Sequence, residues 1–174
     1  MKRKEVIYFE EEGPQNTEKT LELALETANT ENIDYIVVAS GGSTLLKATK
    51  MLKEKEWDDI NIIGVTLQAG TWDKYGEPDW DKIEKARNLG AKSLTCTHAL
   101  MGNVEGSIKD KFGGLPPVEL IAYTYYTFSQ GTKVCVEVSM SAVDAGLVPA
   151  GKEVVAVAGS DNGADTALKL KAVS

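Results

Sequence analysis

The segment Ser40-Gly41-Gly42-Ser43-Thr44 (the 40–44 loop) is the first place where residue types and spacing suggest chemistry. It follows a short apolar run and precedes a helical pattern, so backbone N–H groups and the positive end of a helix dipole are expected together there. Glycine lets the main chain approach a phosphate closely, and Ser43 and Thr44 add small hydroxyl donors. The segment therefore predicts an anion site, although a plain strand-to-helix turn needs the same glycine and N-cap serine.

This loop differs from the common nucleotide-binding motifs. Gly42 is followed by Ser43, which departs from the pattern G-x-x-x-x-G-K-[ST], and no strict G-x-G-x-x-G occurs. ATP hydrolysis and NAD binding are therefore not expected. We expect Gly42→Asp to abolish binding of a phosphate and to leave the fold intact, because the new carboxylate repels the ligand.

A second loop of small residues, Gly159-Ser160-Asp161-Asn162-Gly163 (the 159–163 loop), follows another apolar run. If the two preceding strands are parallel neighbours, both loops lie at the carboxyl edge of the sheet, where open α/β sheets bind ligands. The simpler interpretation is a hairpin turn into the last strand. Gly159, Ser160 and Asn162 are the candidate ligand-binding residues of this loop.

His98 is the one histidine of the chain and follows a predicted strand. An imidazole can donate to a ligand or transfer a proton near neutral pH, so His98 is the candidate catalytic residue. The alternative is an ordinary polar surface residue. Thr66 and Thr97, which lie at strand ends, are expected to offer hydrogen bonds on the same side of a ligand. No G-x-S-x-G elbow occurs, so nucleophilic hydrolysis is not expected.

Strands and amphipathic helices that would position these residues alternate along the chain. Short β-branched runs predict strands over residues 35–39, 60–66, 91–96, 153–158 and 166–173. Apolar residues at helical spacing predict helices over residues 16–30, 44–52 and 80–89. Pro116 and Pro117 are expected to begin a further helix, which Gly131 ends. This order predicts a three-layer α/β/α sandwich.

Residues 133–145 fit two periodicities. Val134, Val136 and Val138 alternate as in a strand, whereas Val134, Val138 and Ala142 recur every four residues as in a helix. Periodicity alone leaves both open, and a length of about a dozen residues favours the helix.

Composition narrows the class of protein. The 174 residues contain 26 acidic and 19 basic side chains, for a formal net charge of -7, which argues against a nucleic acid partner. One domain over residues 1–174 is expected at this length. A single histidine and two cysteines without C-x-x-C spacing do not make a common zinc site, so no metal is expected. Cys96 and Cys135 are expected to be reduced and mostly buried.

The longest uncharged stretches, 60–72 and 120–132, have 13 residues each, whereas a membrane-spanning helix needs about 20. No membrane association is therefore expected. Residues 1–4 are basic like the start of a signal peptide, but the apolar run after them stops at Glu10, too early for a signal sequence. We expect a cytoplasmic protein.

Several segments together resemble the C-terminal domain of pyruvate kinase. They are residues 16–28, 35–43, 61–66 and 145–159, and their order and spacing agree as well. Over nearly the whole chain, the sequence is similar to small stand-alone proteins of that fold from archaea and some bacteria. This wider similarity is carried by Tyr8-Phe9, Asn16-Thr17, Thr97-His98 and Gly163-Ala164-Asp165-Thr166-Ala167.

The resemblance implies an α/β/α sandwich with a mixed, mostly parallel five-stranded sheet whose last strand is antiparallel, and a helix over residues 133–145. In pyruvate kinase, the loop that matches 40–44 holds a phosphate of the allosteric sugar bisphosphate, and the loop that matches 159–163 closes over it. Gly42 stands where that loop often has a cation, and the catalytic barrel has no counterpart here, so kinase activity is not implied. The stand-alone proteins suggest flavin mononucleotide (FMN) as ligand.

Three hypotheses follow. The first is a protein that binds a phosphorylated small molecule, FMN before others, with the phosphate at the 40–44 loop. The second is an enzyme that acts on a sugar phosphate or uses flavin, with His98 in proton transfer. The third is a ligand-free scaffold or oligomerisation module, and a homo-oligomer is open in each case. Under the first, riboflavin should bind at least ~10-fold more weakly than FMN, which is about 1.4 kcal/mol.

Overall fold

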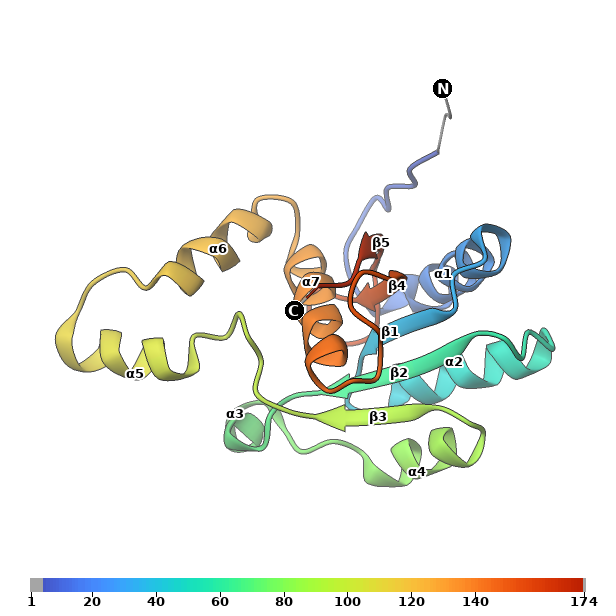
Figure 1. The fold of residues 1–174 in the computed structure, drawn as a ribbon, viewed down its shortest axis with the longest axis horizontal. Helices are drawn as coiled ribbons and strands as arrows, with labels where there is room; N and C mark the ends of the chain where they lie inside the picture. The colour runs from blue at the N-terminus through green and yellow to red at the C-terminus, as the bar shows by residue number, and fades with distance from the viewer. Residues whose placement is uncertain (1–4, 174) are drawn as a thin grey trace.

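The centre of the molecule is a mixed five-stranded sheet (Figure 1). The computed structural model describes residues 5–173. The basic run at residues 1–4 lies outside the described residues. The strands are β1 (Tyr35–Ala39), β2 (Asn61–Thr66), β3 (Lys92–Thr95), β4 (Glu153–Ala158) and β5 (Thr166–Lys171). Their order is β3-β2-β1-β4-β5, and β5 alone runs antiparallel to its neighbour. The predicted fold class is therefore confirmed.

Helices cover both faces of this sheet, because successive side chains of a buried strand point to opposite sides. Ile36 and Val38 pack with Leu25 and Leu45 on one face, whereas Val37 packs with Val138 on the other. The first face holds α1 (Thr17–Glu31), α2 (Ser43–Glu54) and α4 (Trp80–Asn88), and the second holds α7 (Gln130–Asp144). These elements form three layers.

Helix α7 settles the ambiguity over residues 133–145 in favour of a helix. Its N-cap is Ser129, whose hydroxyl accepts the N–H of Thr132 at 2.9 Å. The prediction that Gly131 ends the preceding helix is wrong, because Gly131 lies in the first turn of α7. A Cβ on Gly131 would stand 2.1 Å from the Thr166 hydroxyl oxygen, so glycine allows α7 to approach β5 closely.

Two helices between β3 and α7 project away from the sheet (Figure 1). Helix α6 (Pro117–Tyr126) was expected, whereas α5 (Asn103–Phe112) was not. We call residues 103–126 the α5–α6 arm. Residues 104–128 contain nine of the fifteen exposed large hydrophobic side chains within residues 5–173. The nine are Val104, Ile108, Phe112, Leu115, Leu120, Ile121, Tyr123, Tyr126 and Phe128.

Short elements complete the described chain: 3-10 turns at Pro14–Asn16 and Ala69–Thr71, and α3 (Trp72–Tyr75). Within residues 5–173, no helix is long and apolar enough to span a membrane. Cys96 and Cys135 are both free thiols, as expected. Cys135 is fully buried, which raises the pKa of its thiol, and Cys96 is half-buried.

Candidate functional site

A cavity of ≈ 860 Å³ lies at the carboxyl edge of the sheet. Residues of the 40–44 loop and of the 159–163 loop both line it. The two loops meet because β1 and β4, which precede them, are parallel neighbours, with Val38 opposite Val157. This juxtaposition is the one that the sequence predicts on the assumption of parallel neighbours.

The 40–44 loop leads into α2 and leaves two N–H groups for a ligand. The Ser40 hydroxyl oxygen accepts the N–H of Gly42 at 2.9 Å and of Leu45 at 3.0 Å. The N–H groups of Ser43 and Thr44 have no acceptor within residues 5–173. They point out of the positive end of a 12-residue helix, so this position suits an anion.

A cation stands beside this loop, although the sequence analysis did not find it. Lys82, in the first turn of α4, donates to the Ser43 hydroxyl at 3.0 Å and pairs with the Asp79 carboxylate at 2.9 Å. The N–H of Asp79 in turn donates to the carbonyl of Gly41 at 2.7 Å. Helix α4 therefore brings to the loop a lysine that is paired with Asp79 and donates to Ser43.

Gly42 itself does not line the cavity and packs against the start of α4. Its φ is +127°, and a Cβ there would stand 2.8 Å from the carbonyl oxygen of Asp79. Any side chain at this position would displace the loop. Gly42→Asp is therefore expected to disturb the 40–44 loop itself and does not test the phosphate alone. The neighbouring Ser43 is exposed and lines the cavity, so it is the position at which a charge can be introduced.

The 159–163 loop connects β4 to the antiparallel β5, as the hairpin interpretation predicts, and it also lines the cavity. Gly159, Ser160 and Asn162 all line the cavity. Asp165 Oδ2 accepts the N–H of Ser160 at 3.2 Å, and the Ser160 hydroxyl donates to Glu12 at 2.9 Å. The loop is thereby held against the segment that precedes α1.

Thr66 and Thr97 do not line the cavity. The Thr66 hydroxyl is buried at the sheet edge, where it lies 2.6 Å from the hydroxyl of Thr95. Thr97 lines a separate hollow with Gln68 and Asn103. The expectation that both threonines contact a ligand beside the 40–44 loop is therefore not supported by their positions.

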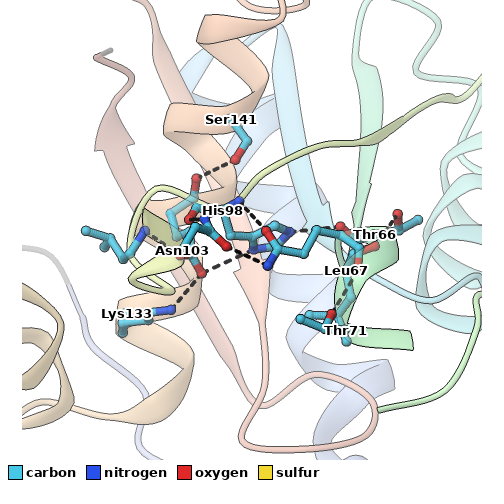
Figure 2. A network of polar contacts seen from close by, with 10 residues as sticks. Thr66, Leu67, Thr71, His98, Asn103, Lys133 and Ser141 are labelled. Atoms are coloured by element: carbon cyan, nitrogen blue, oxygen red, sulfur yellow. Dashed lines mark hydrogen bonds and ion pairs between the residues drawn. The ribbon is translucent and has the colours of Figure 1, made fainter. Parts of the chain in front are cut away.

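His98 does line the cavity, but it is only 3% exposed, so its interpretation as a surface residue is wrong. Its Nε2 lies 2.8 Å from the carbonyl oxygen of Thr66, and its Nδ1 lies 3.3 Å from Glu137 Oε2 (Figure 2). Both ring nitrogens have partners. In this arrangement neither nitrogen is free to exchange a proton with a ligand.

Two charged residues of α7 complete this network. Glu137 Oε2 accepts from the Lys133 ammonium at 2.7 Å, and Glu137 Oε1 accepts the N–H of Leu100 at 2.7 Å. Burial alone would raise the pKa of Glu137, but hydrogen bonding from His98 and the charge of Lys133 outweigh it and lower that pKa. Burial likewise acts to lower the pKa of His98, yet the Glu137 and Thr66 contacts raise it overall.

Amide side chains fix the loop that carries His98 (Figure 2). Gln68 accepts the His98 N–H at 3.1 Å and donates to Asn103 at 2.6 Å, and Asn103 donates to the His98 carbonyl at 2.9 Å. Sequence reasoning missed Lys133 and Glu137. Their one signal is a pair of opposite charges four residues apart within a largely apolar helix.

The remaining wall of the cavity combines aromatic and apolar side chains with charged ones. Tyr75 from α3 and Tyr123 and Tyr126 from the α5–α6 arm line it, together with Leu67 and Met101. The rings of Tyr123 and Tyr126 meet edge to face, with centroids 6.0 Å apart. Burial raises the pKa of Tyr126, with a contribution from the charge of Glu137, so the phenol stays neutral at physiological pH. Within residues 5–173, no His, Cys, Asp and Glu side chains cluster as a metal site.

Comparison with known proteins leaves the family open. No family model matches the chain. Among solved structures, the chain is similar to a crystal structure of an O-ureido-L-serine synthase variant bound to O-ureido-L-serine. The two share 14% sequence identity with a TM-score of 0.33, over 79% of this chain and 49% of that one. The chain thus spans about half the length of this structural neighbour.

Proposed function

We propose that the protein binds a phosphorylated small molecule in the cavity, with the phosphate at the 40–44 loop. The observation that carries this proposal is the pair of unpartnered N–H groups, of Ser43 and Thr44, at the start of α2. The ammonium of Lys82, which is paired with Asp79, lies at the same point and donates to the Ser43 hydroxyl. Several donors and a helix dipole acting on one phosphate make it the strongest single contact expected in the site.

The proposed ligand is FMN. Its identity comes from the resemblance to the stand-alone proteins of the pyruvate kinase C-terminal-domain fold, among which we propose to place this chain. The tyrosines and apolar side chains around Tyr75 and Tyr123 support this choice, because they offer a surface for a ring system. A cytoplasmic location belongs to the same proposal, and the two free thiols are compatible with a reducing compartment.

The test is a fluorescence-quenching titration of FMN and riboflavin with the purified protein. We expect riboflavin to bind at least ~10-fold more weakly, because it lacks the phosphate. Ser43→Asp should abolish FMN binding, since like charges 4 Å apart repel by about 4 kcal/mol at an effective dielectric of 20. Thr97→Asp, an exposed position outside the cavity, is the matched control and should bind FMN normally.

Two outcomes would contradict this proposal. Equal affinities for FMN and riboflavin would exclude the phosphate as anchor. Binding of neither ligand would leave a sugar phosphate or a ligand-free scaffold as the better explanation of the cavity. The enzyme hypothesis with His98 in proton transfer receives no support from the structure, because both ring nitrogens are engaged.

A homo-oligomer is the second candidate function, and the α5–α6 arm favours it. The nine exposed hydrophobic side chains on residues 104–128 form a concentration that is unusual on a monomer surface. Sedimentation velocity should show a species larger than the 18.8 kDa chain. Ile108→Glu combined with Phe112→Glu should return it to the monomer, whereas Val6→Glu, an exposed apolar position outside the arm, should not.

A further inference from the structure

The charged side chains that are buried within residues 5–173 all line the cavity. They are His98, Lys133 and Glu137, with exposures of 3%, 3% and 1%. Charged groups are costly to remove from water unless they are paired. Their gathering at one wall therefore needs an explanation beyond the packing of α7 on the sheet.

The charge of this cluster depends on the protonation of His98. The Thr66 carbonyl can only accept, so His98 Nε2 carries a proton. Nδ1 lies 3.3 Å from Glu137 Oε2, and when this nitrogen is protonated too the ring is an imidazolium paired with that carboxylate. With this imidazolium and the Lys133 ammonium, the cluster contains two positive charges and one negative charge. The cluster then carries a net charge of one positive unit.

The other acidic residues of the lining do not balance this excess from within the protein. All of them are exposed or half-buried: Glu77, Asp79, Asp110, Glu119 and Asp161. Two of them already have cationic partners, Asp79 with Lys82 and Glu119 with Lys109. The buried end of the cavity is thus positive, while its acidic groups lie toward solvent.

We infer that the Lys133 end of the cavity binds the carboxylate of a small organic acid. Within residues 5–173, Glu137 is the one acceptor in hydrogen-bond contact with the Lys133 ammonium, which has three N–H donors, so two remain for a ligand. A carboxylate carries the single negative charge that neutralises the cluster, whereas a phosphate dianion would leave it negative. Carboxylate recognition is thereby assigned to Lys133, and phosphate recognition to the 40–44 loop.

The cavity has room for this acid beside a phosphorylated ligand. Its ≈ 860 Å³ stands toward the upper end of the range of about 300–1,000 Å³ for small-molecule sites. The carboxylate site uses none of the donors of the 40–44 loop. It is therefore independent of the proposed function, and either one can fail without the other.

The single histidine of the chain makes the carboxylate site directly observable by NMR, because its imidazole signals need no assignment among several residues. The probes are acetate, lactate and benzoate, each compared with its neutral amide. A bound carboxylate should shift the His98 signal saturably and raise the His98 pKa further, since a nearby anion favours the imidazolium. The amides should produce neither effect. The charged groups that act on His98 are Glu137 and Lys133 on α7, and Tyr126 on α6 interacts in turn with Glu137.

Substitutions of single residues show where in the cavity the carboxylate binds. Lys133→Met should remove the saturable shift, whereas Lys109→Met, which removes another lysine of the same cavity, should keep it. Ser43→Asp should lose FMN binding and keep the carboxylate response, which separates the two sites. The inference is overturned if the wild-type protein gives no saturable response to any of the three acids, or if the amides act equally. These wild-type results decide the matter even if Lys133→Met does not fold.

Discussion

Replacement of Glu137 by glutamine is the most direct perturbation of the buried charge network. The Glu137 carboxylate contacts three donors: the Lys133 ammonium at 2.7 Å, the Leu100 N–H at 2.7 Å and His98 Nδ1 at 3.3 Å. Glutamine keeps the size of the side chain and one oxygen. Its NH₂ group, however, replaces an acceptor oxygen with a donor, which then stands opposite another donor. Loss of one partner of a buried ion pair costs about 3–5 kcal/mol, because the remaining charge stays buried without compensation.

For a domain of about 150–250 residues, each kcal/mol lowers Tm by roughly 2–4 °C, so Glu137→Gln should lower Tm by about 6–20 °C. Calorimetry and urea unfolding at pH 7 measure this change. Glu119→Gln is the matched control, because its pair with Lys109 is partly exposed and such pairs contribute little. If Glu137→Gln destabilises no more than Glu119→Gln, the carboxylate does not hold the network together and the reasoning fails.

Three further predictions concern stability. The pKa of His98 is raised in the folded state, so protonated His98 stabilises the fold fully below the unfolded pKa of about 6.5. This stabilisation is lost as pH rises through the folded pKa. In urea titrations from pH 6 to 9, the stability difference between the wild type and His98→Gln should therefore narrow. Gly131→Ala should cost about 1–3 kcal/mol in urea unfolding, because its Cβ would overlap Thr166, whereas Gly106→Ala, a helical position with open space, should be neutral or stabilising. Ser43→Asp should not lower Tm, since a carboxylate in the first turn of α2 interacts favourably with the helix dipole and a loss of several degrees would contradict this geometry.

The sheet could be predicted from the sequence because burial on both faces leaves a simple pattern. Ile36, Val37 and Val38 are at most 1% exposed, and such a run of apolar β-branched residues is typical of a central parallel strand. Parallel order then places the 40–44 and 159–163 loops at one edge. The meeting of these loops follows from local signals and one topological rule.

The charge network could not be predicted in the same way. His98 and Glu137 are 39 residues apart, and no periodicity links a loop residue to the helix that covers it. Lys133 and Glu137 are four residues apart, which on most helices indicates an exposed ion pair. The strand alternative for residues 133–145 would have placed these two charges differently. Only the packing of α7 over the loop after β3 turns the pair into a buried contact of His98.

Helix α5 was missed for a different physical reason. Gly102, Gly106, Gly113 and Gly114 follow one another closely, which is typical of loops. The helix has no buried residue, so it does not need an apolar face that packs on the core. Its apolar side chains are scattered over exposed positions, and periodic burial is the signal on which helix prediction mainly depends.

The position of the buried charges of α7 connects the arm to the ligand site. Lys133 and Glu137 lie in the first half of α7, shortly after the arm, and Tyr123 and Tyr126 of α6 line the same cavity. Ala122 is the one residue of α5 and α6 that is buried, so little apolar packing holds the arm to the sheet. Segments with few buried contacts open at low free energy. The cavity therefore combines a rigid charged wall, fixed by hydrogen bonds to β2 and α7, with an aromatic wall whose placement depends on what the arm contacts.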